Sequence, residues 1–282
     1  MDSSLEFLNQ QSLLSTEWVQ FKEDLSQITK HVILINKNLD ATTDVANLIR
    51  RLQFLCYELR SQINENATAE YKLKILNDFF FYQKNFSAVS GDEGDEPTYQ
   101  SLFLEKALLQ RSGSAITMTL IYNHLAQHIG LPLYFIDLDP KCFLKFAGDT
   151  HTIFIDLSHG GKFLSADDLL ENIRRRLKNE KISISQICEG LSPLQFLVNY
   201  LTNLKKYLIR QSNIPDLLIV QNSLLDLLPQ NLSLLGERAI LYYKLNLPKN
   251  SAADLKRYFS FQPRERAPQE LVRIYDEIVG TV

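Results

Sequence analysis

The sequence predicts an α+β domain that is followed by an all-α region of helical repeats. Apolar residues recur at helical spacing from Thr16 to about Glu70, before any strand pattern begins. Three short strand-like runs then follow Gly130, and the last part of the chain has no strand pattern but repeats itself at a fixed interval. We therefore place the α+β domain in residues 1–190 and the repeats in residues 191–282.

Length and composition favour two folding units and exclude several classes of function. The chain has 282 residues, of which 45% are apolar, enough for one large core and a second, smaller one. The net charge of -3 gives no overall field that would gather a polyanion, so we expect no nucleic-acid partner. The longest apolar runs reach about eight residues, whereas a membrane helix needs roughly 20, so we expect no membrane span.

The chain start and the cysteines predict a cytoplasmic protein. Residues 1–6 lack the basic and apolar regions of a secretory signal. Cys56, Cys142 and Cys188 are widely spaced and form no Cys-x-x-Cys pair, so we expect reduced thiols rather than disulfides or a zinc site. The acidic stretch 90–97 lacks the alternating oxygen ligands of a calcium loop and is predicted to be an exposed loop. We expect no cofactor and no metal.

Helices fill the first part of the domain. One predicted helix has its apolar positions at Val45, Leu48, Ile49, Leu52 and Leu55. A helix rich in aromatic residues is expected over 71–86, and a shorter one over 99–109. The segment 111–114 then supplies cap and turn residues for a helix that ends at Gly130.

A small antiparallel sheet is predicted next. Its strands are residues 132–138, 142–146 and 152–157. A hairpin around Gly148 joins the last two strands. After a turn at Gly160-Gly161, Ser165 caps a further helix whose three arginines, residues 174–176, are typical of a solvated face.

The last part of the chain repeats with a period of 34 residues. Pro229 and Pro263 are separated by this interval (263 - 229 = 34), which is the period of tetratricopeptide repeats. The same offset pairs Leu201 with Leu235, Leu208 with Tyr242, Leu218 with Ala252, and Leu224 with Tyr258. Each repeat is predicted to be a helical hairpin with proline after its second helix. Two repeats cannot bury their faces alone, so we expect them to pack on the preceding domain or on a final helix over 269–279.

Four segments in the middle of the chain mark the start and end of a capped helix and then two of the strands that follow it. They are Arg111-Ser112-Gly113-Ser114, Ala126-Gln127-His128-Ile129-Gly130-Leu131-Pro132, Asp139-Pro140-Lys141-Cys142-Phe143 and Phe154-Ile155-Asp156-Leu157-Ser158-His159-Gly160-Gly161. With the repeats, they make the chain similar to the bacterial SirB-type family of transglutaminase-like proteins, and most similar to its YchA-like branch. This resemblance implies a transglutaminase-like, cysteine-protease-like core with N-terminal helices and a small antiparallel sheet. It leaves the physiological role open.

The resemblance also implies a triad of cysteine, histidine and aspartate, and two of the three positions are changed in this chain. The cysteine position falls on Ala115, which carries no nucleophile. The histidine position falls on Cys142, where the family shows a Pro-Gly-His-Phe pattern, and only the acid remains, as Asp156. An acid that orients an absent base does no catalysis, so we expect acyl transfer to be lost.

A rebuilt site is the alternative that the sequence leaves open. Cys142 or Ser114 would be its nucleophile and His151 or His159 its base, and Ser114, Thr117 and His159 would line the cleft. For each of these residues a structural role is favoured. We interpret Cys142 as a small buried apolar residue, Ser114 as a helix cap and His159 as a turn residue.

The register of the hairpin decides which of these side chains meet. If Cys142 lies opposite Asp156, then His151 points to the other face of the sheet. A two-residue turn at Gly148-Asp149 would instead bring His151 to the face of Cys142 and move Asp156 away. Either register leaves the triad incomplete.

We therefore predict a non-catalytic, transglutaminase-like interaction protein that binds a protein or peptide through its C-terminal repeats. The alternative is a cysteine- or serine-dependent hydrolase or acyltransferase that uses a rebuilt site.

Overall fold

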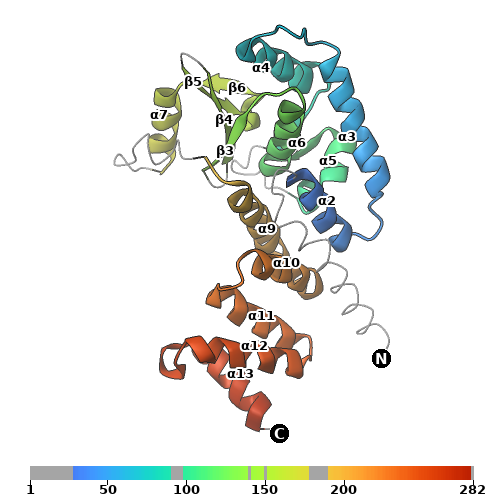
Figure 1. The fold of residues 1–282 in the computed structure, drawn as a ribbon. Coiled ribbons are helices and arrows are strands. Elements are labelled where there is room, and N and C mark those ends of the chain that lie inside the picture. Colours follow the sequence, from blue (N-terminus) through green and yellow to red (C-terminus); the bar gives the residue numbers. More distant parts are fainter. Residues whose placement is uncertain (1–27, 90–97, 139–140, 149–150, 178–189, 281–282) are drawn as a thin grey trace. The chain divides into compact units, whose positions relative to one another are not determined.

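The computed structural model describes residues 28–89, 98–138, 141–148, 151–177 and 190–280 (Figure 1). Its contacts divide the chain into two compact units, Met1–Leu197 and Val198–Val282, and each is described by itself below. The first unit combines helices with small sheets and the second is helical, which confirms the predicted fold class. The predicted acidic loop at 90–97 and Cys188 lie outside the described residues.

Three helices open the described part of the first unit. They are α2 (Ile28–Leu39), α3 (Val45–Arg60) and α4 (Ala69–Asp78). The side chain of Asp44 caps α3 by accepting a hydrogen bond from the backbone of Asn47, and Thr68 caps α4 in the same way. Leu48, Leu52 and Leu55 are buried on α3, which confirms the face that the apolar spacing predicted.

The aromatic helix predicted over 71–86 ends earlier than expected. α4 continues into a short π-helix, η2 (Phe79–Gln83), and Asn85 then has a φ of 54°. The backbone of Phe86 donates to the carbonyl of Phe80 at 3.0 Å, and the two rings stack at 4.5 Å. This stacking turns the chain back on itself and stops the helix, an outcome that apolar periodicity does not reveal.

Two short strands that the sequence did not predict precede the central helix. β1 (Ser87–Val89) pairs in parallel with β2 (Ser112–Ser114). Between them lie η3 (Gln100–Leu102) and α5 (Leu104–Gln110). The central helix α6 (Ala115–His128) follows β2 directly, and most of its residues are buried.

An antiparallel sheet in the order β3-β4-β5-β6 forms the other half of the first unit. Its strands are β3 (Leu133–Leu138), β4 (Lys141–Ala147), β5 (Thr152–Asp156) and β6 (Lys162–Leu164). α7 (Ala166–Leu177) covers one face, where Phe143 and Phe154 pack with Leu169 of that helix. α6 lies against β3 and β4 on the opposite side of the sheet (Figure 1).

The register of β4 and β5 differs from both registers that the sequence suggested. Asp156 pairs with Phe143 and not with Cys142, so Cys142 and Asp156 belong to opposite faces of the sheet. The reason lies at the turn, where the backbone of Gly148 donates to the carbonyl of His151 at 3.1 Å and so belongs to the strand end. A Cβ at Gly148 would approach that carbonyl and the ring of Phe146 to 3.0 Å, so close packing explains the glycine.

Helix α9 (Pro193–Arg210) begins in the first unit and continues into the second. Its start is tied to β3 by a bridge between Phe135 and Leu191 and by the rings of Phe135 and Phe196, which stack at 3.9 Å. Four further helices follow: α10 (Ile214–Leu227), α11 (Leu232–Lys244), α12 (Pro248–Phe261) and, after η5 (Arg264–Arg266), α13 (Gln269–Gly280).

The repeat of 34 residues is visible in the helices themselves. Both ends of α10 and α12 differ by 34 (248 - 214 and 261 - 227), as do the last residues of α9 and α11 (244 - 210). The connections also match, because Ser212 and Asn246 both have positive φ, 53° and 57°. α13 contacts α11 and α12, which confirms the final helix as their packing partner.

Polar side chains of the first repeat reach across to the second repeat. Lys205 of α9 forms an ion pair with Glu237 of α11. The buried amide of Gln221 donates to the carbonyl of Leu234 at 2.7 Å and to Glu237 at 2.9 Å. The two repeats are therefore joined by hydrogen bonds as well as by apolar contacts.

Candidate functional site

The start of α6 is where the resemblance places the lost nucleophile. Ala115 is the first residue of this helix and is 7% exposed. Ser114 is its N-cap, and its hydroxyl accepts a hydrogen bond from the backbone of Thr117 at 3.4 Å and lies 2.8 Å from the Thr117 hydroxyl. Thr117 in turn donates to the carbonyl of Leu102 at 3.3 Å. Both hydroxyls are buried and serve the helix start, and their role as cleft-lining groups stays a prediction.

Gly113 holds this helix start close to its neighbours. A Cβ at this position would lie 2.8 Å from the terminal carbon of Met118 and 2.9 Å from Cβ of Ala107. Only glycine lets β2 approach both α5 and α6 so closely, and the position of Ala115 depends on that approach.

Cys142 lies on β4, where it pairs with Asp137 of β3. It alternates with Phe143 and therefore shares the face of Leu144 and Phe146, which is the face toward α6. The side chain is 7% exposed and forms no disulfide. This environment matches the interpretation of Cys142 as a buried apolar residue.

Asp156 ends β5 and caps the short helix η4 (Leu157–His159). One carboxylate oxygen accepts a hydrogen bond from the backbone of Ser158 at 3.0 Å, and the other lies 2.8 Å from Nδ1 of His159. The side chain of Asp156 is 10% exposed and that of His159 is 50% exposed. A buried carboxylate beside a half-exposed imidazole has the geometry in which an acid orients a base, and in this chain the same carboxylate also caps η4.

The sequence identified both members of this pair but not their contact. The sequence signal for this contact is the spacing of three residues between Asp156 and His159, which places both side chains on one turn of a short helix. His159 also lies directly before Gly160 and Gly161, whose φ angles of 66° and 74° turn the chain. η4 packs against β1, β4 and α6.

His151 is exposed and lies at the turn of the hairpin, opposite Gly148. Cys142 lies six residues before Gly148 on β4, and at 3.3 Å per residue this separates the two ends of the strand by about 20 Å. The hairpin therefore keeps His151 away from Cys142, although both have the same parity in the observed register.

The part of the chain that the structure describes shows neither a metal-ligand cluster nor a membrane-spanning helix. Within the ranges that the structure describes, no group of three or more histidine, cysteine, aspartate or glutamate side chains is placed to hold a metal ion. Across the same ranges, no helix combines the length and apolarity that are needed to cross a bilayer.

Comparison with known proteins identifies two families in the chain. A family described as the transglutaminase-like superfamily matches residues 46–202, and a tetratricopeptide repeat family matches residues 204–274. The chain is similar to a UPF0162 protein of Xylella fastidiosa (strain Temecula1), with 24% identity over 208 residues that cover 73% of each chain. It is also similar to a UPF0162 protein of Buchnera aphidicola, with 25% identity over 77% of this chain and 79% of the relative.

Among solved structures, the chain is similar to menin, whose crystal structure is described as revealing the binding site for the Mixed Lineage Leukemia protein. The TM-score is 0.40 and the identity is 13%, over 85% of this chain and 65% of the menin chain.

Proposed function

We propose that this chain, which belongs to the transglutaminase-like superfamily, is a non-catalytic member of it. We propose that it acts as a protein-interaction or scaffold module. Within the superfamily we propose the SirB-type, YchA-like branch, on the motifs around Arg111, Pro140 and Asp156. We propose a cytoplasmic location, with no nucleic-acid or membrane partner, on the composition of the chain.

The observation that carries the proposal is the alanine at the start of α6. Acyl transfer by a transglutaminase-like site needs a thiolate at this helix start, where the helix dipole stabilises the negative charge. Ala115 offers only a methyl group there. The adjacent hydroxyl of Ser114 lies against Thr117 in the cap and would have to leave this contact to attack a substrate. Cys142 at the histidine position supplies no imidazole.

The C-terminal repeats support an interaction role. Tetratricopeptide repeats commonly mediate protein–protein contacts, because stacked helical hairpins present an extended surface. The partner class that we propose is a protein or a peptide. Asn222, Arg238 and Asp254 join three helices of this region by hydrogen bonds of 2.7 to 3.0 Å and so stabilise the surface that would bind.

The second candidate is a hydrolase or acyltransferase with a rebuilt site, and the contact of Asp156 with His159 favours it. Of the two histidines that we considered as bases, His159 has a carboxylate 2.8 Å from Nδ1. The nucleophile would be Cys142 or Ser114, both of them buried. Substrate would therefore have to reach a buried thiol or a hydroxyl that already caps a helix.

An activity panel separates the two candidates. The full chain is incubated with amide and ester substrates, beside the variants Asp156→Ala and Asp167→Ala, the latter an exposed aspartate of α7 that serves as the matched control. We expect no turnover by any of the three proteins. Turnover that Asp156→Ala abolishes and Asp167→Ala retains would refute the non-catalytic proposal.

Two further measurements complete the test. Iodoacetamide labelling of the native chain at mildly acidic pH, with Cys142→Ser as control, should leave Cys142 unmodified, whereas rapid labelling would support a catalytic thiol. A peptide array probed with the full chain should give binders that Asp156→Ala retains and that Arg238→Met loses, because the latter disturbs the repeats. Binders that Arg238→Met retains in full would argue against the repeats as the binding region.

A further inference from the structure

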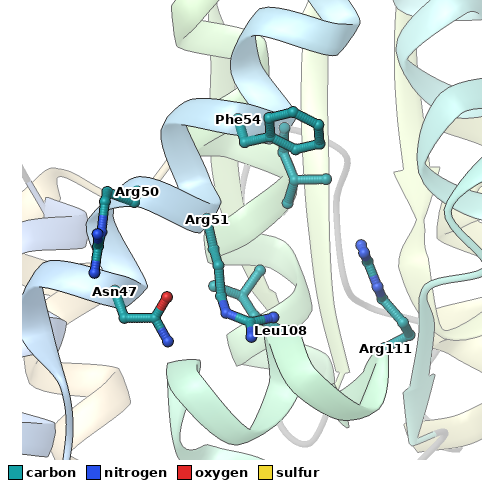
Figure 2. A pocket seen from close by; sticks show the side chains of 7 residues that line it. Asn47, Arg50, Arg51, Phe54, Leu108 and Arg111 are labelled. Carbon is teal, nitrogen blue, oxygen red and sulfur yellow. The ribbon is translucent and has the colours of Figure 1, made fainter.

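A pocket of about 510 Å³ lies between α3 and the end of α5, and none of Ala115, Cys142 and Asp156 lines it. Figure 2 shows Asn47, Arg51 and Phe54 projecting from α3 toward Leu108 and Arg111, with Arg50 at the edge. Three arginines line the pocket, and its lining contains no acidic residue. This volume falls in the range of small-molecule sites, roughly 300–1,000 Å³.

Arg111 is held in place by its backbone and by an aromatic ring. It follows α5 with a left-handed φ of 57°, and its carbonyl accepts a hydrogen bond from Ser87 of β1. The guanidinium lies over the ring of Phe86 at 4.8 Å, which fixes its direction. One of its nitrogens, Nη1, is buried and has no hydrogen-bond partner among the residues that the structure describes. A buried, charged donor is costly to leave unpaired, so a ligand acceptor that reached this nitrogen would relieve that cost.

Arg51 approaches the same space from the other side. It is exposed on α3, and in the described part of the chain neither Arg50 nor Arg51 has a recorded hydrogen bond or ion pair. The nearby carboxylate of Asp44 accepts the backbone hydrogen bond of Asn47 at the helix start. The positive charge of the pocket is therefore not balanced by a lining carboxylate, which favours an anion.

Apart from Asn47, the rest of the lining is apolar. Phe54 is 62% exposed although it lines the pocket, and Leu108 is buried at its base. An exposed aromatic ring beside cationic groups suits a ligand that has both a charged group and a flat apolar part.

We propose that this pocket binds a small phosphorylated molecule. Arg51 and Arg111 would donate to the phosphate oxygens from two sides, and the flat part of the ligand would rest on Phe54. Guanidinium groups pair with both phosphates and carboxylates. Two groups that approach from opposite sides of a pocket fit the tetrahedral oxygens of a phosphate better than the two coplanar oxygens of a carboxylate. The proposal does not depend on whether the triad is catalytic.

Calorimetric titration with phenyl phosphate, inorganic phosphate and benzoate tests the proposal. We expect phenyl phosphate to bind most tightly, because it alone satisfies both the arginines and Phe54. Arg51→Gln and Arg111→Gln should each weaken it by on the order of tenfold or more, since each removes a charge-assisted hydrogen bond. Arg60→Gln, an exposed arginine of the same helix outside the pocket lining, is the matched control and should bind normally.

The variant Phe54→Ala tests the contribution of the apolar contact to binding separately from that of the arginines. It should weaken phenyl phosphate and leave inorganic phosphate unchanged. Thermal unfolding of each variant shows whether it is folded, and Arg51→Gln carries the test if Arg111→Gln fails to fold. Wild-type protein that binds none of the three probes, binding that Arg51→Gln leaves unchanged, or an equal loss in Arg60→Gln would overturn the proposal. Tighter binding of benzoate than of phenyl phosphate would overturn the assignment to phosphate.

Discussion

Arg238 and Asp254 form the buried ion pair of the repeat region, and its disruption gives the sharpest test of how that region is held together. Nε and Nη2 of Arg238 on α11 donate to the two carboxylate oxygens of Asp254 on α12 at 2.7 and 2.8 Å. Nη1 donates to Asn222 of α10 at 3.0 Å. Burial alone would lower the pKa of Arg238, but the hydrogen bond and the charge of Asp254 raise it. The charged pair is therefore the stable form.

Asp254→Asn should destabilise the repeats by about 3 kcal/mol. Removing one member of a buried pair costs about 3–5 kcal/mol, because the other charge stays buried without compensation. The side chains of Arg238 and Asp254 are only 20% and 10% exposed, and asparagine keeps one acceptor oxygen, which places the cost at the lower end. Combining Asp254→Asn with Arg238→Met should cost less than the sum of the two single changes.

The ion pair of Glu171 and Arg175 on α7 is the matched control. Its distance of 2.6 Å is as short as those of the buried pair, but both side chains are 71% exposed. Glu171→Gln should therefore cost less than about 0.5 kcal/mol, because water and salt screen an exposed pair. Burial, rather than distance, should decide the outcome.

Urea unfolding followed by circular dichroism measures these changes. Hydrogen exchange of α11 and α12 assigns them to the repeats, since two compact units need not unfold together. A cost below about 1 kcal/mol for Asp254→Asn, or an equal cost for Glu171→Gln, would refute the reasoning.

Three further predictions concern the first unit. Gly113→Ala should destabilise the chain by about 1–3 kcal/mol in thermal unfolding, because its Cβ would lie 2.9 Å from Cβ of Ala107 and 3.1 Å from the carbonyl oxygen of Ser101. Burial lowers the pKa of His31 from 6.5 to about 2. Below a pH of about 6.5, His31 is therefore protonated in the unfolded state but stays neutral in the folded state. Stability in urea should consequently fall by about 1.4 kcal/mol per pH unit below that value, and His31→Gln should flatten this fall. Burial raises the pKa of Cys56 to about 11, so mass spectrometry after alkylation at neutral pH should find it modified only in urea.

Features that depend on local periodicity could be predicted from the sequence. The buried positions Leu48, Leu52 and Leu55 follow from helical spacing on a single element. The repeats follow from a comparison of the chain with itself, and the matching bounds of α10 and α12 show why it worked. Both features are visible in the order of residues along the chain, so they could be predicted without knowledge of tertiary contacts.

Features that depend on pairing between segments were missed. β1 and β2 are three residues each and pair across more than twenty residues of intervening chain, too short a pattern for alternation to reveal. The hairpin register was wrong because Gly148 was interpreted as a turn residue, whereas it is a packing residue at a strand end. An error of one residue moves every side chain to the other face of the sheet.

The arginine pocket was out of reach for the same reason. Arg50 and Arg51 have the exposed, helical setting of ordinary surface residues, and we had interpreted Arg111 as part of a cap and turn. Arg51 and Arg111 line one pocket because α3 and the end of α5 lie on two sides of it, and that is a tertiary arrangement. The burial of Nη1 of Arg111, which singles out this arginine, exists only in the folded chain.

Asp156 and Ser114 have a structural role that would keep them in a non-catalytic protein, whereas Ala115 has none. Asp156 caps η4 through Ser158 and orients His159, so the fold alone gives a reason for its presence, with or without catalysis. The structural role predicts that Asp156→Asn lowers stability and leaves no activity to lose, whereas a catalytic role predicts a loss of turnover in a folded protein. The same ambiguity affects Ser114, whose hydroxyl caps α6. Ala115 has no such second explanation, because an alanine at a helix start neither caps the helix nor attacks a substrate. The loss of acyl transfer that we propose therefore depends on the methyl group at the start of α6 and not on Asp156.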